Sequence, residues 1–171
     1  MTDEQELLLE SVREFCDRYF TEDVIKEMYE TGDMPDEIAE AYRDAGFGLM
    51  GIPEEYGGIP CDKVTLGMMI EELYHSSGCN HILYQNSLTA FDIVEFGTPE
   101  QIQKYMDAYM ETGWPLSSLS ISEPGAGSDN RNMSCTAKKQ DDGTYRLNGQ
   151  KTWVTMGAKL PYTIVVAKDE D

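Results

Sequence analysis

The chain has 171 residues, a length that suits one domain or one domain with part of a second. Its 32 acidic and 13 basic residues give a net charge of −19, which repels nucleic-acid phosphates and anionic lipids and argues against both as partners. No apolar run approaches the roughly 18 residues needed to span a bilayer, and the acidic N-terminus lacks a signal-peptide layout. We therefore expect a soluble cytoplasmic protein with no nucleic-acid or membrane partner.

The charge is unevenly distributed along the chain. Residues 1–115 hold 25 acidic and 6 basic residues, whereas residues 116–171 hold seven of each. Two segments of different chemistry therefore meet near residue 115, and we expect two domains, 1–115 and 116–171.

Residues 1–115 show helical periodicity throughout, which predicts an all-α bundle of about six helices. Thr2 with Gln5 and Thr98 with Gln101 each form a capping box, and Pro99 occupies a first helical position. The expected helices follow Thr2, cover Glu22–Glu30, and run from Asp36 to Gly46, Asp62 to Gly78, Asn80 to Phe96 and Thr98 to Gly113.

After Pro115 the periodicity changes to that of strands. Strands are expected over 116–121, 133–139, 145–149, 151–155 and 162–167, with a hairpin turn at Asp141–Gly143. The fold class is thus α+β, with the helical bundle followed by an incomplete antiparallel β-barrel segment. The chain stops directly after a strand and would leave an open sheet edge, so we expect a fragment, a single-domain piece or one half of a split protein.

Outside residues 116–171, few residues suggest a catalytic, metal-binding or ligand-binding role. His75 and His81 have no neighbouring carboxylate or cysteine at metal-ligand spacing and are interpreted as ordinary surface histidines. Four cysteines form no C-x-x-C pair, so a zinc ribbon or thioredoxin motif is excluded, and we interpret them as buried small apolar residues. No metal site is expected.

The glycine-rich loop 122–129, with the sequence Ser-Glu-Pro-Gly-Ala-Gly-Ser-Asp, is the first candidate site. Its glycines allow positive φ angles and close approach of another group, and its backbone N–H groups, with the Ser122 and Ser128 hydroxyls, could gather around an anion. A plain β-turn is an equally good interpretation. The loop is neither a Walker A motif nor a dinucleotide fingerprint.

The second candidate is Lys-Thr-Trp-Val-Thr at 151–155. In a strand, Trp153 and Thr155 would share one face, where an indole could cover a planar ring and a hydroxyl could bond its edge. A core tryptophan is the competing interpretation.

Together these stretches resemble the flavin-binding region of the acyl-CoA dehydrogenase family. The main resemblance lies in two stretches, Ser-Ile-Ser-Glu-Pro-Gly-Ala-Gly-Ser-Asp at 120–129 and Leu-Asn-Gly-Gln-Lys-Thr-Trp-Val-Thr at 147–155. Three earlier stretches match as well: Gly-Ile-Pro-Glu-Glu-Tyr-Gly-Gly at 51–58, Glu-Glu-Leu at 71–73 and Gly-Thr-Pro-Glu-Gln-Ile-Gln-Lys-Tyr at 97–105. The likeness covers the whole chain in order.

The resemblance implies an N-terminal helical domain, part of a middle β-domain and FAD as cofactor. By the resemblance Leu119, Ile121 and Ser122 line the flavin, Gly127 and Ser128 approach the cofactor, and Trp153 and Thr155 flank its ring. Ser128 would also approach the acyl-CoA. Leu119 and Ser122 depart from the commonest family pattern, although serine keeps the hydroxyl of the usual threonine.

The resemblance also implies the reaction, in which a glutamate removes the α-proton of an acyl-CoA thioester while a hydride passes to the flavin. No catalytic residue is assigned within 1–171, because that glutamate belongs to a C-terminal bundle; Glu123 is given a structural role in its turn. We therefore expect this chain alone not to be a competent catalyst. The implied electron partner is an electron-transfer flavoprotein, and full-length members of the family form homo-oligomers.

Three alternatives remain open at this stage. The stretches at 83–85 and 97–99 resemble crotonobetainyl-CoA reductases, for which the physiological direction is enoyl-CoA reduction. The same fold also serves acyl-CoA oxidases and flavin monooxygenases. A non-catalytic acidic helical interaction module is the alternative outside the enzymes.

Overall fold

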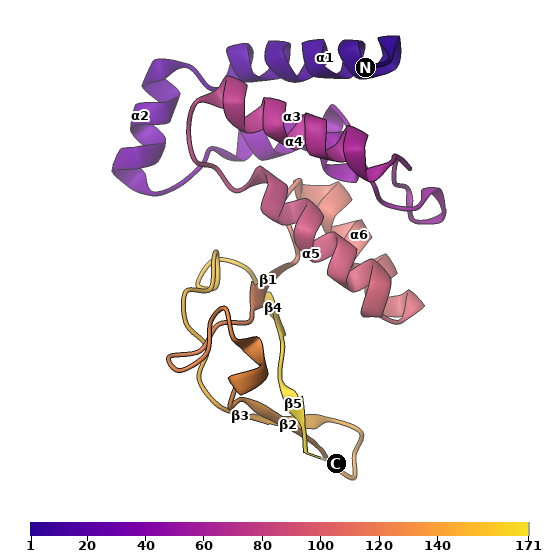
Figure 1. Ribbon diagram of the computed structural model, residues 1–171, viewed down its shortest axis with the longest axis vertical. Coiled ribbons are helices and arrows are strands. Elements are labelled where there is room, and N and C mark those ends of the chain that lie inside the picture. The colour runs from indigo at the N-terminus through magenta and orange to yellow at the C-terminus, as the bar shows by residue number, and fades with distance from the viewer. Residues whose placement is uncertain (171) are drawn as a thin grey trace. The chain divides into compact units, whose positions relative to one another are not determined.

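The computed structural model describes residues 1–170, apart from the side chains of residues 85–87. Contacts divide the chain into two compact units, Met1–Pro115 and Leu116–Asp171. The first unit is helical and the second holds short strands and loops (Figure 1). The α+β class expected from the sequence is confirmed.

The first unit contains the expected helices within its described backbone. Both capping boxes are present, with the Thr2 and Thr98 hydroxyls each accepting a bond from the backbone N–H three residues later. Gly32, Gly78 and Gly113 end helices in the left-handed conformation, which glycine adopts without a Cβ penalty. The helices are α1 (Asp3–Tyr19), α2 (Glu22–Thr31), α3 (Asp36–Asp44), α4 (Lys63–Ser77), α5 (Leu83–Phe96) and α6 (Pro99–Thr112), with short 3-10 turns at Phe47–Leu49 and Glu54–Tyr56.

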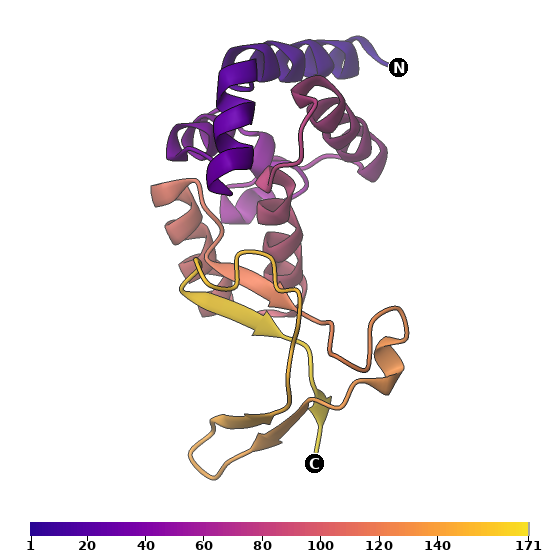
Figure 2. The same cartoon turned by 90° about the vertical axis from the view of Figure 1, so that its left-hand side faces the viewer.

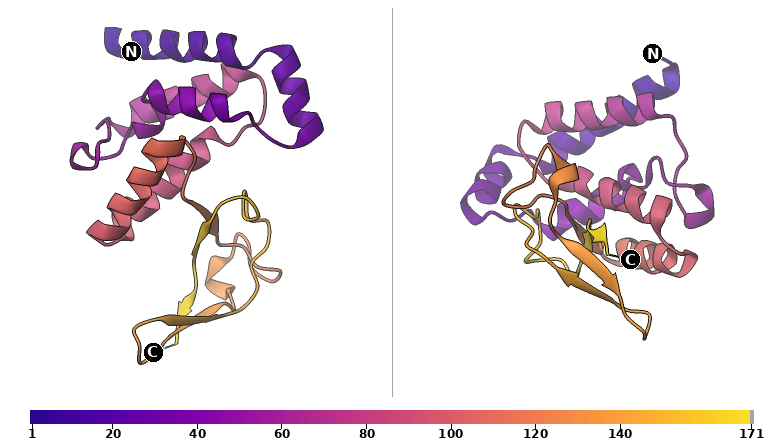
Figure 3. Two further views of the ribbon diagram at one scale, coloured as in Figure 1. Left: turned by 180° about the vertical axis from the view of Figure 1, so that it is seen from behind. Right: turned by 60° about the horizontal axis from the view of Figure 1, so that its bottom comes forward.

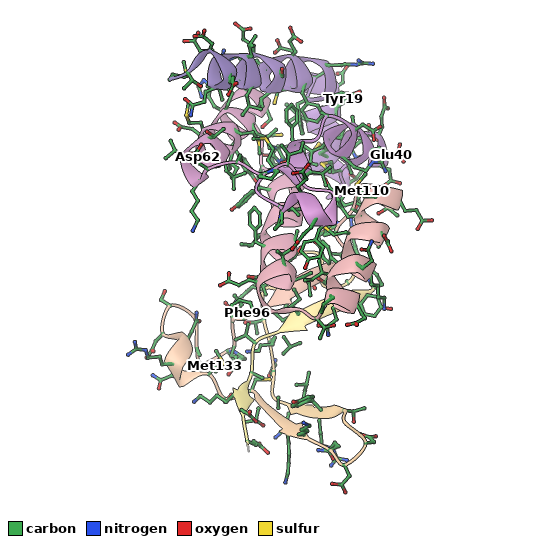
Figure 4. The ribbon with its side chains drawn as sticks, turned by 90° about the vertical axis from the view of Figure 1, so that its right-hand side faces the viewer. Tyr19, Glu40, Asp62, Phe96, Met110 and Met133 are labelled. Atoms are coloured by element: carbon green, nitrogen blue, oxygen red, sulfur yellow. The ribbon has the colours of Figure 1, made fainter. Side chains whose placement is uncertain are left out.

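Apolar helix faces meet in the core of this unit. Helices α1 and α4 lie side by side (Figure 3), and side chains fill the space between the helices (Figure 4, where Tyr19 marks the end of α1 and Asp62 precedes α4). The largest fully buried side chains here include Tyr42, Ile52, Met69, Leu73 and Tyr105. Burial of such side chains is the main driving force for folding.

His81 corrects one expectation. It is only 5% exposed, and its ring stacks between Phe20 and Tyr74, with centroid distances of 5.0 Å and 4.3 Å. It precedes α5, which begins at Leu83 rather than Asn80. The surface interpretation was therefore wrong for His81, whereas His75 is exposed.

The second unit holds two small sheets. Strand β1 (Ser117–Ser120) pairs in parallel with β4 (Tyr162–Val165), and β2 (Thr136–Lys139) pairs in parallel with the short β5 (Lys168–Asp169). Strands β2 and β3 (Tyr145–Asn148) form the expected antiparallel hairpin (Figure 2). The sequence pattern predicts antiparallel pairing, whereas two of these pairings are parallel. Both join strands far apart in the chain, and only such long connections permit parallel pairing.

One predicted strand is absent from this unit. Residues 151–155 form no strand, and a turn follows from Thr155. Trp153 has a φ of 58°, a left-handed conformation that a strand cannot contain. Trp153 and Thr155 therefore do not share a strand face.

No helix among the described residues is long and apolar enough to cross a membrane. The side chain of Gln85, part of the reductase-like stretch at 83–85, lies outside the described residues.

Candidate functional site

The glycine-rich loop after β1 is a tight turn. The Glu123 N–H donates to the Ala126 carbonyl at 2.8 Å, and the Ala126 N–H donates back to the Glu123 carbonyl at 3.2 Å. Gly125 and Gly127 both have negative φ, and a Cβ at either position would meet nothing within 4 Å. Neither glycine uses the positive φ that the lack of a side chain allows, and what these glycines leave is open space beside the backbone.

Glu123 is buried and fully occupied by hydrogen bonds. Its Oε2 accepts from the Ser134 N–H at 2.5 Å and from the Ser134 hydroxyl at 2.8 Å. Its Oε1 accepts from the Cys135 N–H at 2.8 Å and from the Lys151 ammonium at 2.9 Å. The bonds from the Ser134 backbone and from Lys151 lower the Glu123 pKa to about 2, because they stabilise the charged carboxylate.

Lys151 and Thr152 connect the second candidate segment to the first. The Lys151 ammonium also donates to the Ile121 carbonyl at 2.8 Å, and the Thr152 N–H donates to the Ser122 carbonyl at 2.9 Å. The segment at 121–123 and the segment at 151–152 therefore lie side by side. This is the juxtaposition that a shared site requires.

The predicted residues differ in accessibility. Leu119, Ile121 and Ser122 are half-buried, whereas Gly127, Ser128 and Thr155 are exposed. Trp153 is 93% exposed, which excludes the core-tryptophan interpretation within the described chain. Ser122 and Ile121 come next to the 151–152 segment, while no hydrogen bond among the described residues joins Gly127 or Ser128 to it.

Several hydroxyl groups near these segments are available to a ligand. The Ser122, Ser128 and Thr155 side chains make no hydrogen bond to any described residue. The Thr152 Oγ1 is buried and has no hydrogen-bond partner there either. Buried polar atoms normally have partners, so this atom is suited to bonding a group that the chain itself does not supply.

Sequence reasoning missed Lys151 and Ser134. Neither belongs to a recognisable acid–base or ligand pattern. The single signal in the sequence that pointed to such partners was Glu123, a charged residue in a turn otherwise made mostly of small residues and proline. Its burial, and hence its need for donors, became visible only in the structure.

Metal ligands and reactive thiols are not gathered anywhere among residues 1–170. No group of three His, Cys, Asp or Glu side chains in that range is placed to hold a metal ion. Cys16, Cys79 and Cys135 are buried free thiols and Cys61 is half-buried. Burial raises the Cys16 pKa to about 12, which keeps that thiol protonated and unreactive.

Comparisons with known proteins agree along the whole chain. Residues 2–112 match the family described as acyl-CoA dehydrogenase, N-terminal domain, and residues 118–171 match acyl-CoA dehydrogenase, middle domain. The probable acyl-CoA dehydrogenase YdiO of Escherichia coli K12 is 38% identical over 169 residues, which cover 99% of this chain and 44% of YdiO. The caffeyl-CoA reductase-Etf complex subunit CarC of Acetobacterium woodii is 32% identical, with 99% and 45% coverage.

A solved structure supports the same assignment. The acyl-CoA dehydrogenase of Bacillus anthracis complexed with FAD superposes with a TM-score of 0.79 at 28% identity, covering 99% of this chain and 29% of that one. The chain thus spans less than half the length of these relatives. Matches to both domains, in the expected order, show that the chain belongs to the acyl-CoA dehydrogenase family.

Proposed function

We propose that this chain carries residues of the FAD site of an acyl-CoA dehydrogenase that oxidises the α,β-bond of an acyl-CoA thioester or catalyses the reverse reduction. The observation that carries the proposal is the pairing of the 121–123 and 151–152 segments by the Thr152-to-Ser122 backbone bond and the Lys151-to-Ile121 bond. That pairing connects the two sequence stretches with the greatest resemblance to the family's flavin-binding region.

The residues present are suited to FAD. Trp153 offers an exposed aromatic face, which can cover a planar ring. Within the described part of the chain, the Ser122 and Thr155 hydroxyls have no hydrogen-bond partner, and Thr152 Oγ1 is a buried atom without one. Such atoms can bond the nitrogens and carbonyls at a flavin edge. Gly127 adds no side-chain bulk to the loop.

Each residue then has a limited role. Ser122 and Thr155 would bond the cofactor, Trp153 would cover its ring, and Leu119 and Ile121 would supply apolar contact. Ser128 would approach both the cofactor and the thioester. FAD, when bound, supplies the hydride acceptor, while the chain orients the reacting groups. No residue of this chain is proposed as the base.

The partners proposed are an acyl-CoA or enoyl-CoA thioester and an electron-transfer flavoprotein. The relative CarC is named as a subunit of a caffeyl-CoA reductase-Etf complex, which supports an Etf partner and keeps the reductive direction, as in a crotonobetainyl-CoA reductase, within the proposal. Homo-oligomerisation of the whole protein and a cytoplasmic location stay predictions.

Tryptophan fluorescence offers a direct test, because the chain has two tryptophans. Trp114 donates its indole N–H to Asp36 at 2.8 Å in the helical unit, whereas Trp153 belongs to the candidate site. FAD should quench the emission of Trp114→Phe, in which Trp153 alone emits. It should leave the emission of the matched variant Trp153→Phe nearly unchanged.

Equal quenching in both variants would contradict the site assignment. A chain that retains no flavin absorbance after incubation with FAD and desalting would contradict the proposed cofactor binding by this chain. In the whole protein, rapid reoxidation of reduced flavin by air would favour the acyl-CoA oxidase or monooxygenase alternative over the dehydrogenase.

A further inference from the structure

The Glu123–Lys151 pair is more extensively bonded than an ordinary ion pair. The two side chains are 2% and 10% exposed, with 2.9 Å between Oε1 and Nζ. Through its partners the pair reaches three stretches of chain: 121–123, 134–135 and 151. It therefore lies at the junction of the segments that hold the candidate flavin residues.

The chemistry of the carboxylate is specific. Oε2 accepts from Ser134 while Oε1 accepts from Cys135 and Lys151, so both oxygens act as acceptors. A glutamine has a single acceptor oxygen, and its NH₂ group would face an N–H donor. An uncharged isostere therefore cannot reproduce the bonding.

Lys151 is needed for the hydrogen bonds that its ammonium group donates. Its ammonium provides at least two donors, one to the carboxylate and one to the Ile121 carbonyl. A backbone carbonyl fixes a position along the chain, so this second bond aligns residue 151 with residue 121. Buried ion pairs are often no more stabilising than apolar residues of similar volume, and a role in alignment gives this one a purpose.

We propose that Glu123 and Lys151 are positioning residues that hold the 121–123 and 151–153 segments in register. The part of this inference that concerns FAD rests on the proposed function; the alignment itself does not. Without the pair, the hydrogen bond from the Thr152 N–H to the Ser122 carbonyl loses the neighbouring bonds of Lys151 that hold the two segments together. Ser122, Thr152 and Trp153 would then no longer be held at fixed positions relative to one another.

Hydrogen exchange at the Thr152 amide tests the alignment without any cofactor. We expect Lys151→Met to reduce protection of this amide by about tenfold or more, since hydrogen bonds to charged groups are among the stronger ones. Lys151→Arg should restore most of the protection. Protection within the β2–β3 hairpin should stay unchanged, and the matched control Lys138→Met, at an exposed residue of β2, should leave Thr152 unaffected.

Lys151→Met leaves the Glu123 carboxylate buried without its cation, which by itself destabilises a fold. The double variant Glu123→Gln/Lys151→Met removes both charges together, so no unpaired buried charge is left to cause a folding defect. If this variant or Lys151→Met keeps wild-type protection at Thr152, the proposal is overturned. A loss of protection spread evenly over the hairpin as well would also overturn it, because it would show a general stabilising role.

FAD titration of the same proteins separates the two proposals. We expect the FAD dissociation constant to rise about tenfold in Lys151→Met and to recover in Lys151→Arg. If the wild-type chain binds no FAD while Thr152 still responds to Lys151→Met, the positioning role stands and the proposed function fails. If FAD binds equally well to wild type and Lys151→Met, the alignment does not serve the cofactor.

Discussion

Acidification should destabilise the helical unit through His81. The ring is buried between Phe20 and Tyr74, and neither of its nitrogens has a well-formed hydrogen bond to any residue that the structure describes. Burial lowers the His81 pKa to about 4 from an ordinary value of 6.5. The nearby Leu73 backbone raises this pKa, but by less than burial lowers it. The unfolded chain therefore binds a proton at a pH where the folded chain does not.

The size of the effect follows from the two pKa values. Because the folded pKa is depressed, the stability contribution is complete above pH 6.5 and is lost as the pH falls toward 4. A shift from 6.5 to about 4 corresponds to about 3 kcal/mol in full, and about 2 kcal/mol of this is lost by pH 5.

Urea unfolding at pH 7.5 and pH 5, followed by circular dichroism, measures this loss. In His81→Phe a ring that never titrates replaces the imidazole between its two aromatic neighbours. The many carboxylates are common to both proteins, so their contribution cancels in the difference between wild type and variant. We expect His81→Phe to lack the loss of about 2 kcal/mol, while His75→Gln, at an exposed histidine, keeps it.

The reasoning fails if wild type and His81→Phe respond equally to the change in pH. It also fails if nuclear magnetic resonance finds the His81 ring protonated in the folded chain at pH 6. Either result would mean that the ring reaches water or a hydrogen-bond acceptor in solution.

Three further predictions concern other parts of the chain. Gly48→Ala should destabilise the helical unit by about 1–3 kcal/mol, because the new Cβ would lie 1.8 Å from Tyr109 Oη; Gly67→Ala, where a Cβ meets nothing within 4 Å, should instead be neutral or stabilising in the same urea titration. Thr98→Ala should cost about 1 kcal/mol by removing the capping box of α6, and an unchanged unfolding midpoint would show that the cap contributes nothing. Since the Glu123 pKa is depressed to about 2, its contribution should be present above pH 4.5 and lost as the pH falls toward 2, a transition that acid unfolding should show in wild type and not in Glu123→Gln.

The helical unit was largely predictable because its signals are local. A capping hydroxyl with its partner three residues later, a glycine after the last turn and an apolar stripe each lie within one helix. Thr98 with Gln101 shows this directly, since both bonds of the box are present. His81 was misinterpreted because its burial depends on Phe20, 61 positions earlier in the sequence, and periodicity carries no such information.

The strand unit was less predictable for the same reason. The hairpin at Asp141–Gly143 is local and was found, whereas β1 pairs with β4 across more than 40 residues. Residues 151–155 alternate like a strand, yet Trp153 has a φ of 58°.

The failed strand and the candidate site have a common origin. The Lys151 ammonium and the Thr152 N–H are both bonded to the 121–123 segment, so the backbone after them follows those bonds rather than a sheet ladder. Non-glycine residues in the left-handed region cost energy, and they persist when neighbouring contacts determine them. Here the contacts lie immediately before Trp153, and the side chain that results is 93% exposed. A strand would have given Trp153 a neighbour on the sheet; the anchored loop instead leaves its ring open to a ligand.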